Sequence, residues 1–439
     1  MRLPIGLAAA VVFSCLLSCA FAEASDVKPG DLITPDNAAK VADLVSPGNL
    51  VLVKQGMQMK IVPTERLEWP PPYKTATEKY SPQVRLDEQG QLHNYVAGLP
   101  FPLLDPNDPQ VAYKAMWNFS FRPAFTDDVD IRDVELASFR PGGVADDPIA
   151  LYLFGHVGFY NNIGRTEVDP IPTDPDANTG IRYRFGAGPF VRPGSPFGWS
   201  FIRFRYMPPG VEDNVWMNGI RNTAERLSDI LGATCDRCGM LGAFARTFDA
   251  DSFFGFAAKI EDFDYKLLAV KPMLASVHAA GLPANRCVAD GGRTICPENW
   301  ELRQVYVIEA DIKPQSWTQK IGNDGVTIPK RIIYIDSEGW FITASDQYDR
   351  EGKLWKTVAT FNTYRDHSSP GASTAVRPFK RIFQTAMVDE DVQTGISTVL
   401  SSPGHETPAR ETWFINQGVV TETTFTPGRY RTHRSFYEQ

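Results

Sequence analysis

The chain has 439 residues and a net charge of −8, and acidic and basic side chains are mixed along it. Nucleic acid is therefore not an expected partner, because phosphate binding requires a basic surface excess. Hydrophobic residues make up 43% of the chain, which is enough for a sizeable core, and 34 glycines with 34 prolines favour strands and turns over long helices.

The first 22 residues have the pattern of a secretory signal peptide. Arg2 supplies a positive start, residues 5–17 form an apolar run too short to span a bilayer permanently, and Ala20-Phe21-Ala22 offers a small-x-small cleavage site. The pattern predicts an exported, periplasmic protein. Lipoprotein processing at Cys19 is the alternative, although Leu17 fits the lipoprotein motif poorly.

Residues 23–110 are expected to form an N-terminal helix, a proline-rich strap and loops that pack on a sheet domain of residues 111–439. Asp36 or Asn37 is predicted to cap the helix. Pro70-Pro71-Pro72 is predicted to be a polyproline connector, because three prolines remove three backbone donors.

The first part of the sheet domain begins with a predicted helix over Val111–Asn118, which Asp108 would cap, and strands over Ile131–Arg140 and Ile149–Tyr160. Farther along, Phe201-Ile202-Arg203-Phe204-Arg205-Tyr206 alternates, so that the two arginines share one strand face and Ile202, Phe204 and Tyr206 share the other. The arginine face is either a cationic wall for an anionic head group or, more simply, the solvated outer face of the sheet.

Four cysteines follow the signal segment. Cys235 and Cys238 have the CxxC spacing of redox and zinc motifs, and Cys287 and Cys296 are more widely spaced. In an oxidising compartment the simplest expectation is two short-loop disulfides, Cys235–Cys238 and Cys287–Cys296, with a four-thiolate zinc site and redox catalysis as the alternatives.

Alternating side chains are clearest between residues 300 and 365. Strands are predicted over Val305–Ile312, Lys330–Ile335, Trp340–Gln347 and Lys353–Asn362, and the last three are separated by tight turns that contain Gly339 and Gly352. The pattern predicts an antiparallel meander, in which Tyr306, Ile308, Ala310 and Ile312 lie on one face.

Signatures of catalysis are not found in the sequence. It has no nucleophile elbow, P-loop, zinc-protease helix, EF-hand loop or dinucleotide fingerprint. The six histidines are scattered, and His156, in an apolar strand, is the one most worth locating. Glu309 and Asp311 alternate on one strand, which a solvent-facing row explains more simply than a metal or glycosidase site. We therefore predict no catalytic residue, metal or cofactor, with a hydrolase assembled from distant residues as the remaining alternative.

Several segments together resemble one proteobacterial family. They include Asp43–Asn49, the Trp69–Tyr73 and Asn94–Pro102 runs, Asp262–Leu268 and the meander. The chain is similar to the domain of unknown function 1329 family, which is often labelled outer-membrane lipoprotein-sorting-like. The resemblance implies a LolA/LolB-like fold, mainly β with short helices: a strongly curved antiparallel sheet, or incomplete barrel, with helices covering its concave face.

The same resemblance implies association with a resistance-nodulation-division-type inner-membrane transporter and an outer-membrane protein, and it supplies no catalytic residues. A half-barrel suits acyl chains, because each buried methylene contributes about 0.8 kcal/mol. The leading hypothesis is a periplasmic carrier or chaperone for a lipid or other hydrophobic molecule, and the alternative is a non-enzymatic envelope assembly or scaffold protein. The candidate groove residues are Tyr306, Ile308, Ile312, Trp340, Ile342, Phe204 and Tyr206.

Overall fold

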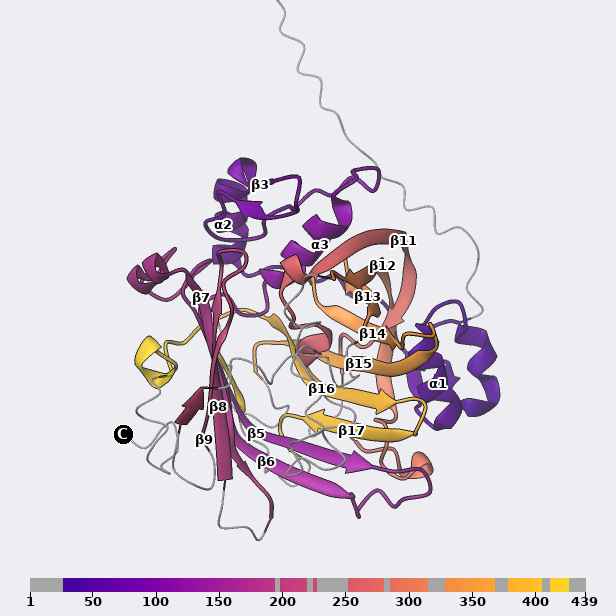
Figure 1. Cartoon of the computed structure of the whole chain (residues 1–439). Coiled ribbons are helices and arrows are strands. Elements are labelled where there is room, and N and C mark those ends of the chain that lie inside the picture. Colours follow the sequence, from indigo (N-terminus) through magenta and orange to yellow (C-terminus); the bar gives the residue numbers. More distant parts are fainter. Residues whose placement is uncertain are drawn as a thin grey trace, which may run out of the picture.

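One large β-sheet dominates the structure, a computed structural model (Figure 1). The model describes residues 27–193, 198–218, 224–226, 252–279, 285–314, 328–367, 378–404 and 411–425. The sheet has 16 strands in the order β1-β2-β12-β13-β14-β15-β16-β17-β5-β6-β7-β8-β9-β10, with β11 paired to β12 and β18 paired to β5. The protein is therefore mainly β, as the sequence predicts.

The strands of this sheet vary from two to fifteen residues. Their bounds are β1 (Leu32–Ile33), β2 (Met59–Ile61), β5 (Asp128–Phe139), β6 (Ala150–Asn161), β7 (Ile181–Val191), β8 (Gly198–Tyr206), β9 (Asn214–Asn218), β10 (Ala224–Arg226), β11 (Phe263–Ala275), β12 (Glu298–Ile312), β13 (Lys330–Asp336), β14 (Ile342–Tyr348), β15 (Leu354–Arg365), β16 (Arg381–Asp391), β17 (Ile396–Ser401) and β18 (Trp413–Ile415). A separate hairpin joins β3 (Arg85–Leu86) and β4 (Leu92–His93).

Short helices decorate the sheet. The α-helices are α1 (Pro47–Gln55), α2 (Pro71–Tyr80) and α3 (Val111–Ser120), and the 3₁₀ helices are η1 (Pro35–Val41), η2 (Ser81–Gln83), η3 (Pro175–Thr179), η4 (Phe253–Gly255), η5 (Ile260–Asp262), η6 (Val288–Asp290) and η8 (Glu422–Phe425). None of the helices in the described ranges combines the length and apolar character that a membrane crossing requires.

The predicted meander is confirmed. Strands β12, β13, β14 and β15 pair in sequence order, and each pair is antiparallel. The sheet as a whole is not purely antiparallel, however, because β2 adds to the start of β12 in parallel, with Met59 opposite Glu298. A parallel partner needs a long connection, and the many residues between β2 and β12 supply it.

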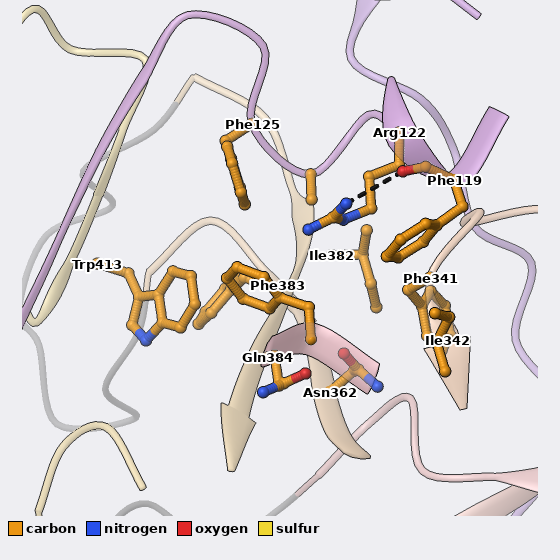
Figure 2. A pocket seen from close by; sticks show the side chains of 12 residues that line it. Phe119, Arg122, Phe125, Phe341, Ile342, Asn362, Ile382, Phe383, Gln384 and Trp413 are labelled. Carbon is orange, nitrogen blue, oxygen red and sulfur yellow. Dashed lines mark hydrogen bonds between the residues drawn. The ribbon is translucent and has the colours of Figure 1, made fainter. Parts of the chain in front are cut away.

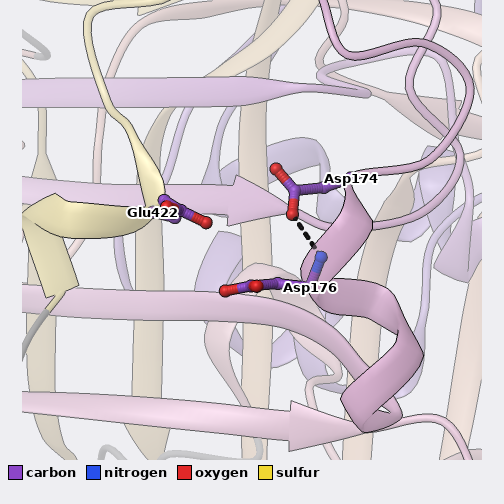
Figure 3. A group of neighbouring side chains, drawn as sticks. All are labelled: Asp174, Asp176 and Glu422. Atoms are coloured by element: carbon purple, nitrogen blue, oxygen red, sulfur yellow. Dashed lines mark hydrogen bonds between the residues drawn. The ribbon is translucent and has the colours of Figure 1, made fainter.

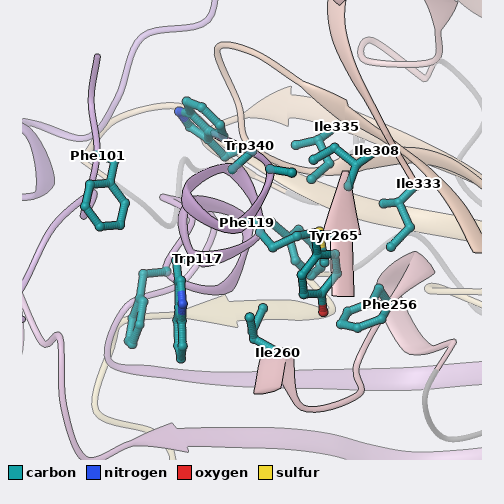
Figure 4. Close-up of a cluster of buried hydrophobic side chains, with 14 of the residues drawn as sticks. Phe101, Trp117, Phe119, Phe256, Ile260, Tyr265, Ile308, Ile333, Ile335 and Trp340 are labelled. Atoms are coloured by element: carbon teal, nitrogen blue, oxygen red, sulfur yellow. The ribbon is translucent and has the colours of Figure 1, made fainter. Parts of the chain in front are cut away.

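Helix α3 packs on one face of β11, β12 and β13. Trp117 and Phe119 of the helix belong to the same buried cluster as Tyr265, Ile308 and Ile333 (Figure 4). The predicted face of β12 is also confirmed, because Ile308 and Ala310 lie in this cluster, and Tyr306 and Ile312 pack against it. Val305 and Val307 belong to a different cluster, so β12 is buried on both faces.

The N-terminus of α1 lies directly on a buried carboxylate from β14. Asp346 accepts hydrogen bonds from the Gly48 amide (3.1 Å), the Ser46 hydroxyl (3.1 Å) and the Thr357 hydroxyl (2.8 Å). The unpaired amides of a first helical turn favour an anion, and only glycine leaves room for the backbone to approach this closely. Burial nevertheless raises the pKa of Asp346 to about 6. Leu52, farther along α1, is fully buried in the adjoining cluster.

Two predictions for the N-terminal segment are wrong. Pro71 and Pro72 form the first turn of α2, where a missing amide hydrogen breaks no helical hydrogen bond, so the segment is not a polyproline connector. The helix near residue 36 is η1, and its N-cap is Thr34, whose amide donates to the Asn37 side chain (2.7 Å).

Candidate functional site

Two adjoining pockets lie beside the C-terminal end of α3. They share four lining residues, Phe119, Arg122, Phe125 and Phe254. The larger pocket spans about 730 Å³ and the smaller about 350 Å³ of space between atoms, and both figures include open solvent, so the room for a ligand is a fraction of each. Because the shared residues form a wall of both, we treat the two pockets as one candidate site.

The two pockets extend toward opposite parts of the sheet. The larger one reaches β6, β7 and β8 and is lined by Phe119, Ser120, Arg122, Phe125, Phe159, Asn161, Arg182, Tyr183, Phe185, Arg203, Arg205, Phe253, Phe254, Phe256, Ala257 and Ala258. The smaller one reaches β14, β15, β16 and β18, and Figure 2 shows its lining: Phe119, Arg122, Ala124, Phe125, Phe254, Phe341, Ile342, Asn362, Ile382, Phe383, Gln384 and Trp413.

The end of α3 places Arg122 between the pockets. The helix stops at Ser120, and the Arg122 side chain turns back to donate a hydrogen bond from Nη1 to the Phe119 carbonyl (3.0 Å; Figure 2). The guanidinium carbon lies 4.5 Å from the centre of the Phe119 ring, 5.2 Å from that of Phe125 and 5.0 Å from that of Phe254. Arg122 is thus held by ring faces and by a carbonyl at the negative end of a helix.

Helix η4 supplies the opposite wall. Phe254 has φ 57°, in the left-handed region that costs a bulky residue on the order of 1–2 kcal/mol. Gly255 follows at φ 88°, and a β-carbon there would stand 2.5 Å from Cγ2 of Ile342 in β14. The turn holds the Phe254 ring 5.8 Å from the rings of both Phe125 and Phe159. The strained backbone therefore serves to bring aromatic rings together at this site.

Aromatic side chains of the larger pocket form a continuous cluster. The ring of Phe159 in β6 lies 4.4 Å from that of Phe185 in β7 and 5.2 Å from that of Phe125, and the Phe253 ring lies 5.7 Å from that of Phe185. Such a lining removes apolar ligand surface from water and can bind a molecule through burial alone.

The arginine face of β8 points into the larger pocket. Arg203 and Arg205 are each only 6% exposed, so the predicted solvated outer face is wrong, although the predicted alternation is confirmed. They are buried because the pocket wall and Asp213 cover them: Asp213 accepts hydrogen bonds from Nε (2.9 Å) and Nη2 (2.8 Å) of Arg205 and lies 3.7 Å from Arg203. Although burial acts in the opposite direction, these guanidinium groups lower the pKa of Asp213.

Arg182 and Arg122 differ from the β8 arginines. Arg182 Nη2 donates to the carbonyl (2.7 Å) and hydroxyl (2.8 Å) of Ser120, and its guanidinium lies over the Phe121 ring. Across the described residues, neither Arg122 nor Arg182 has a carboxylate within ion-pair distance. Burial lowers the pKa of Arg122 to about 10, helped by the charge of nearby Arg182, and burial also lowers the pKa of Arg182. Arg122 remains a cation at neutral pH.

The predicted groove residues are divided among three places. Ile342 lines the smaller pocket. Ile308 and Trp340 lie in the cluster under α3, with Tyr306 and Ile312 packed against it; the Tyr306 and Trp340 rings stack at 5.7 Å. Phe204 packs on the opposite face of β8 with Trp216, and the Tyr206 hydroxyl accepts a hydrogen bond from Asn214 (2.5 Å). That these residues contact a ligand is still a prediction.

Most of the lining is absent from the sequence prediction. Phe119, Arg122 and Phe125 follow a predicted helix, and Phe253 to Phe256 is a short aromatic run with one glycine. A search for aromatic residues beside arginine or glycine just outside regular elements would have found both segments. Their juxtaposition, however, depends on the sheet.

One predicted disulfide is present. Cys287 and Cys296 form a bond with a Cα–Cα distance of 4.8 Å. The predicted Cys235–Cys238 pair lies outside the described residues. The Cys287–Cys296 bond lines neither pocket.

Titratable clusters elsewhere are internally paired. His156 Nδ1 lies 2.9 Å from Asp130, which also accepts a hydrogen bond from Arg132 (2.6 Å), and neither His156 nor Asp130 lines the pockets. Asp174, Asp176 and Glu422 form the acidic group found in the described part of the chain (Figure 3). The Tyr160 hydroxyl donates to Asp174 (2.5 Å) and Arg184 donates to Asp176 (2.7 Å), so two of the three carboxylates already accept a hydrogen bond from a neighbouring side chain.

Comparisons with known proteins identify a family. A family model described as "Protein of unknown function (DUF1329)" matches residues 32–146 and 231–431. No functionally curated protein matches the chain significantly.

Three solved structures are similar to the chain. A candidate outer membrane lipoprotein-sorting protein domain from Vibrio parahaemolyticus is 15% identical, with a TM-score of 0.44 over 73% of this chain and 97% of that one. A DUF1329 family protein from Desulfovibrio piger is 13% identical, with a TM-score of 0.43 over 74% and 99%. A LolA superfamily protein from Nitrosomonas europaea is 15% identical, with a TM-score of 0.32 over 64% and 88%. At these TM-scores no ligand can be transferred to this chain.

Proposed function

The chain belongs to the DUF1329 family of proteins of unknown function, and we propose that it is a carrier or chaperone that binds a lipid or other hydrophobic molecule. The observation that carries the proposal is the phenylalanine lining of the two joined pockets beside α3. A carrier has to bind apolar surface reversibly. At about 25 cal/mol per Å², burying roughly 200 Å² of ligand surface would contribute about 5 kcal/mol before the entropy cost of association.

The same proposal includes a sheet curved into an incomplete barrel, with α3 and η4 in its concave face. Contacts with two strands that lie apart in the sheet support it. The Gly255 backbone lies against Ile342 of β14, and the neighbouring Phe254 ring lies against Phe159 of β6. Five strand-to-strand steps separate β14 from β6 in the sheet, so one short segment can touch both strands only if the sheet bends around it.

We further propose that the protein acts in the periplasm, between a resistance-nodulation-division-type inner-membrane transporter and an outer-membrane protein. The signal-peptide pattern of residues 1–22 supports the compartment, and the family resemblance supports the partners. Anchoring through Cys19 is the alternative to a free periplasmic form.

The proposal is tested with a neutral apolar fluorophore, N-phenyl-1-naphthylamine. The wild-type protein should bind it, and Phe125→Ala, which removes a ring shared by both pockets, should weaken binding about tenfold, the equivalent of ~1.4 kcal/mol. Phe414→Ala is the matched control, because Phe414 is a half-buried phenylalanine that lines neither pocket.

Lipid extraction and native mass spectrometry of protein purified from the periplasm form the second measurement. Co-purification of a hydrophobic molecule is expected. Protein that binds no fluorophore and carries no such molecule would overturn the carrier, and stoichiometric crosslinking to one envelope protein would then favour a scaffold.

A further inference from the structure

Two of the four arginines on the cationic side of the larger pocket lack an ion-pair partner among the described residues. Four arginines line it, and Asp213 pairs with the two on β8. Lys259 lies 3.7 Å from both Asp213 and Glu261, so it is paired as well. Arg122 and Arg182 are left without a carboxylate in the described part of the chain.

A structural role as helix caps accounts for only part of this charge. Arg122 donates to the Phe119 carbonyl and Arg182 to the Ser120 carbonyl, both at the C-terminal end of α3. The negative end of a helix is equivalent to roughly half an elementary charge, whereas the two guanidiniums carry two. The helix end therefore balances only part of the charge of these two side chains.

Donors also remain available. A guanidinium has five N–H groups, and the described hydrogen bonds of Arg122 and Arg182 use Nη1 of the first and Nη2 of the second. Both side chains are partly exposed rather than fully buried. Two neighbouring guanidinium groups with free N–H donors match a carboxylate or phosphate.

An apolar wall begins within a few ångströms of these cations. The Arg122 guanidinium carbon lies 5.2 Å from the centre of the Phe125 ring and 5.0 Å from that of Phe254, and both rings continue into the smaller pocket. A ligand whose anionic group pairs with Arg122 and Arg182 would thus place any attached chain among phenylalanines.

We propose that the ligand of this site is an anionic amphiphile, whose carboxylate- or phosphate-like head group binds Arg122 and Arg182 and whose apolar chain lies among Phe125, Phe159 and Phe254. This inference rests on the proposed function and deepens it, because it specifies the ligand's charge and orientation. It assigns to Arg182 and Arg122 a role in selecting ligands that the β8 arginines, paired with Asp213, do not share.

The test compares two molecules with the same chain. Decanoate and 1-decanol are each used to displace N-phenyl-1-naphthylamine from the wild-type protein at pH 8. Decanoate should bind about tenfold or more tightly than decanol, because a charge-assisted hydrogen bond is added. Arg182→Met and Arg122→Met should remove this preference while decanol binding stays, and Arg140→Met, an exposed arginine outside the pockets, should leave the preference unchanged.

Further arms separate the outcomes. Equal binding of decanoate and decanol, with fluorophore binding intact, would overturn the head-group inference and leave the carrier standing. If inorganic phosphate displaces the fluorophore as strongly as decanoate does, the site binds small anions. This result would also overturn the proposal that the ligand is an amphiphile. If the wild-type protein binds no fluorophore, that result would instead contradict the proposal that it is a carrier. If the methionine variants do not fold, Arg182→Lys and the salt dependence of the wild-type preference decide, because an ionic preference has to weaken with added salt.

Discussion

Gly48→Ala separates two opposing effects at the start of α1. On helix propensity alone, replacing a helical glycine with alanine stabilises by about 1 kcal/mol. In this structure, the new β-carbon would overlap the Thr357 hydroxyl and the Asp346 carboxylate. Overpacking of this kind costs typically about 1–3 kcal/mol.

Moving α1 away to relieve the overlap would have a further cost. The hydrogen bonds from the Gly48 amide and the Ser46 hydroxyl to Asp346 would be lost, at about 1 kcal/mol each, and Leu52 would be partly drawn out of its cluster. The cost of the steric overlap at Asp346 and Thr357 is therefore larger than the gain from the helix propensity of alanine. We expect a net loss of about 2–4 kcal/mol in the free energy of unfolding.

Urea and thermal unfolding followed by circular dichroism measure this loss. Lys54→Ala, an exposed position on the same helix, is the control and should stay within about 0.5 kcal/mol of wild type. In a double-mutant cycle, Thr357→Gly should recover part of the Gly48→Ala loss, because it removes both the hydroxyl and the β-carbon that the new methyl group overlaps. A Gly48→Ala protein as stable as wild type would refute the described docking of α1 on β14.

Three other variants test the fold and the site. Burial raises the pKa of Asp346 to about 6, so native Asp346 keeps a proton that the unfolded chain loses near pH 4. The contribution of Asp346 to stability should therefore fall as pH rises from about 4 to 6. In urea titrations, Asp346→Asn should gain stability relative to wild type between about pH 5 and 7.5. Loss of the disulfide in Cys287→Ser/Cys296→Ser should cost about 2–3 kcal/mol, and an unchanged urea midpoint would contradict this. Gly255→Ala should destabilise the protein by several kcal/mol and weaken fluorophore binding, because its β-carbon meets Ile342 at a positive φ; normal binding would show that the geometry of η4 does not shape the pocket.

Local patterns predicted the parts of the fold that local geometry determines. The β12–β15 meander follows from alternation and glycine turns, so β13, β14 and β15 were found within three residues at each end, whereas β12 begins seven residues before the predicted Val305. Helix α1 was missed because Pro47-Gly48 has the composition of a turn, and the helix start is stabilised by Asp346, 298 residues away. The prolines of α2 led to a wrong prediction because proline is excluded from a helix interior but is accepted in the first helical turn.

Prediction of the site was limited by the same physics. The arginine alternation on β8 was visible, but whether that face meets water or a pocket depends on Asp213 and on the segment around Phe256. Arg122 is visible in the sequence as an arginine among aromatic residues, but its role is not, because that role comes from the end of α3 meeting Phe254. Charges that lack partners can be recognised only after the partners have been placed.

The contact between α1 and Asp346 also bears on the order in which the protein can fold. Ser46 and Gly48 are made early in synthesis, whereas their carboxylate partner lies about 300 residues later. In the same way, β2 can pair with β12 only after the segment that begins at Glu298 has been made. Such distant pairings are slow to form, because the entropy of closing a long loop is lost before any contact compensates it. The N-terminal layer can therefore assemble only after most of the chain is available. For a chain that leaves the cytoplasm with its N-terminus first, this delay would keep the leading segment unfolded until the rest has followed.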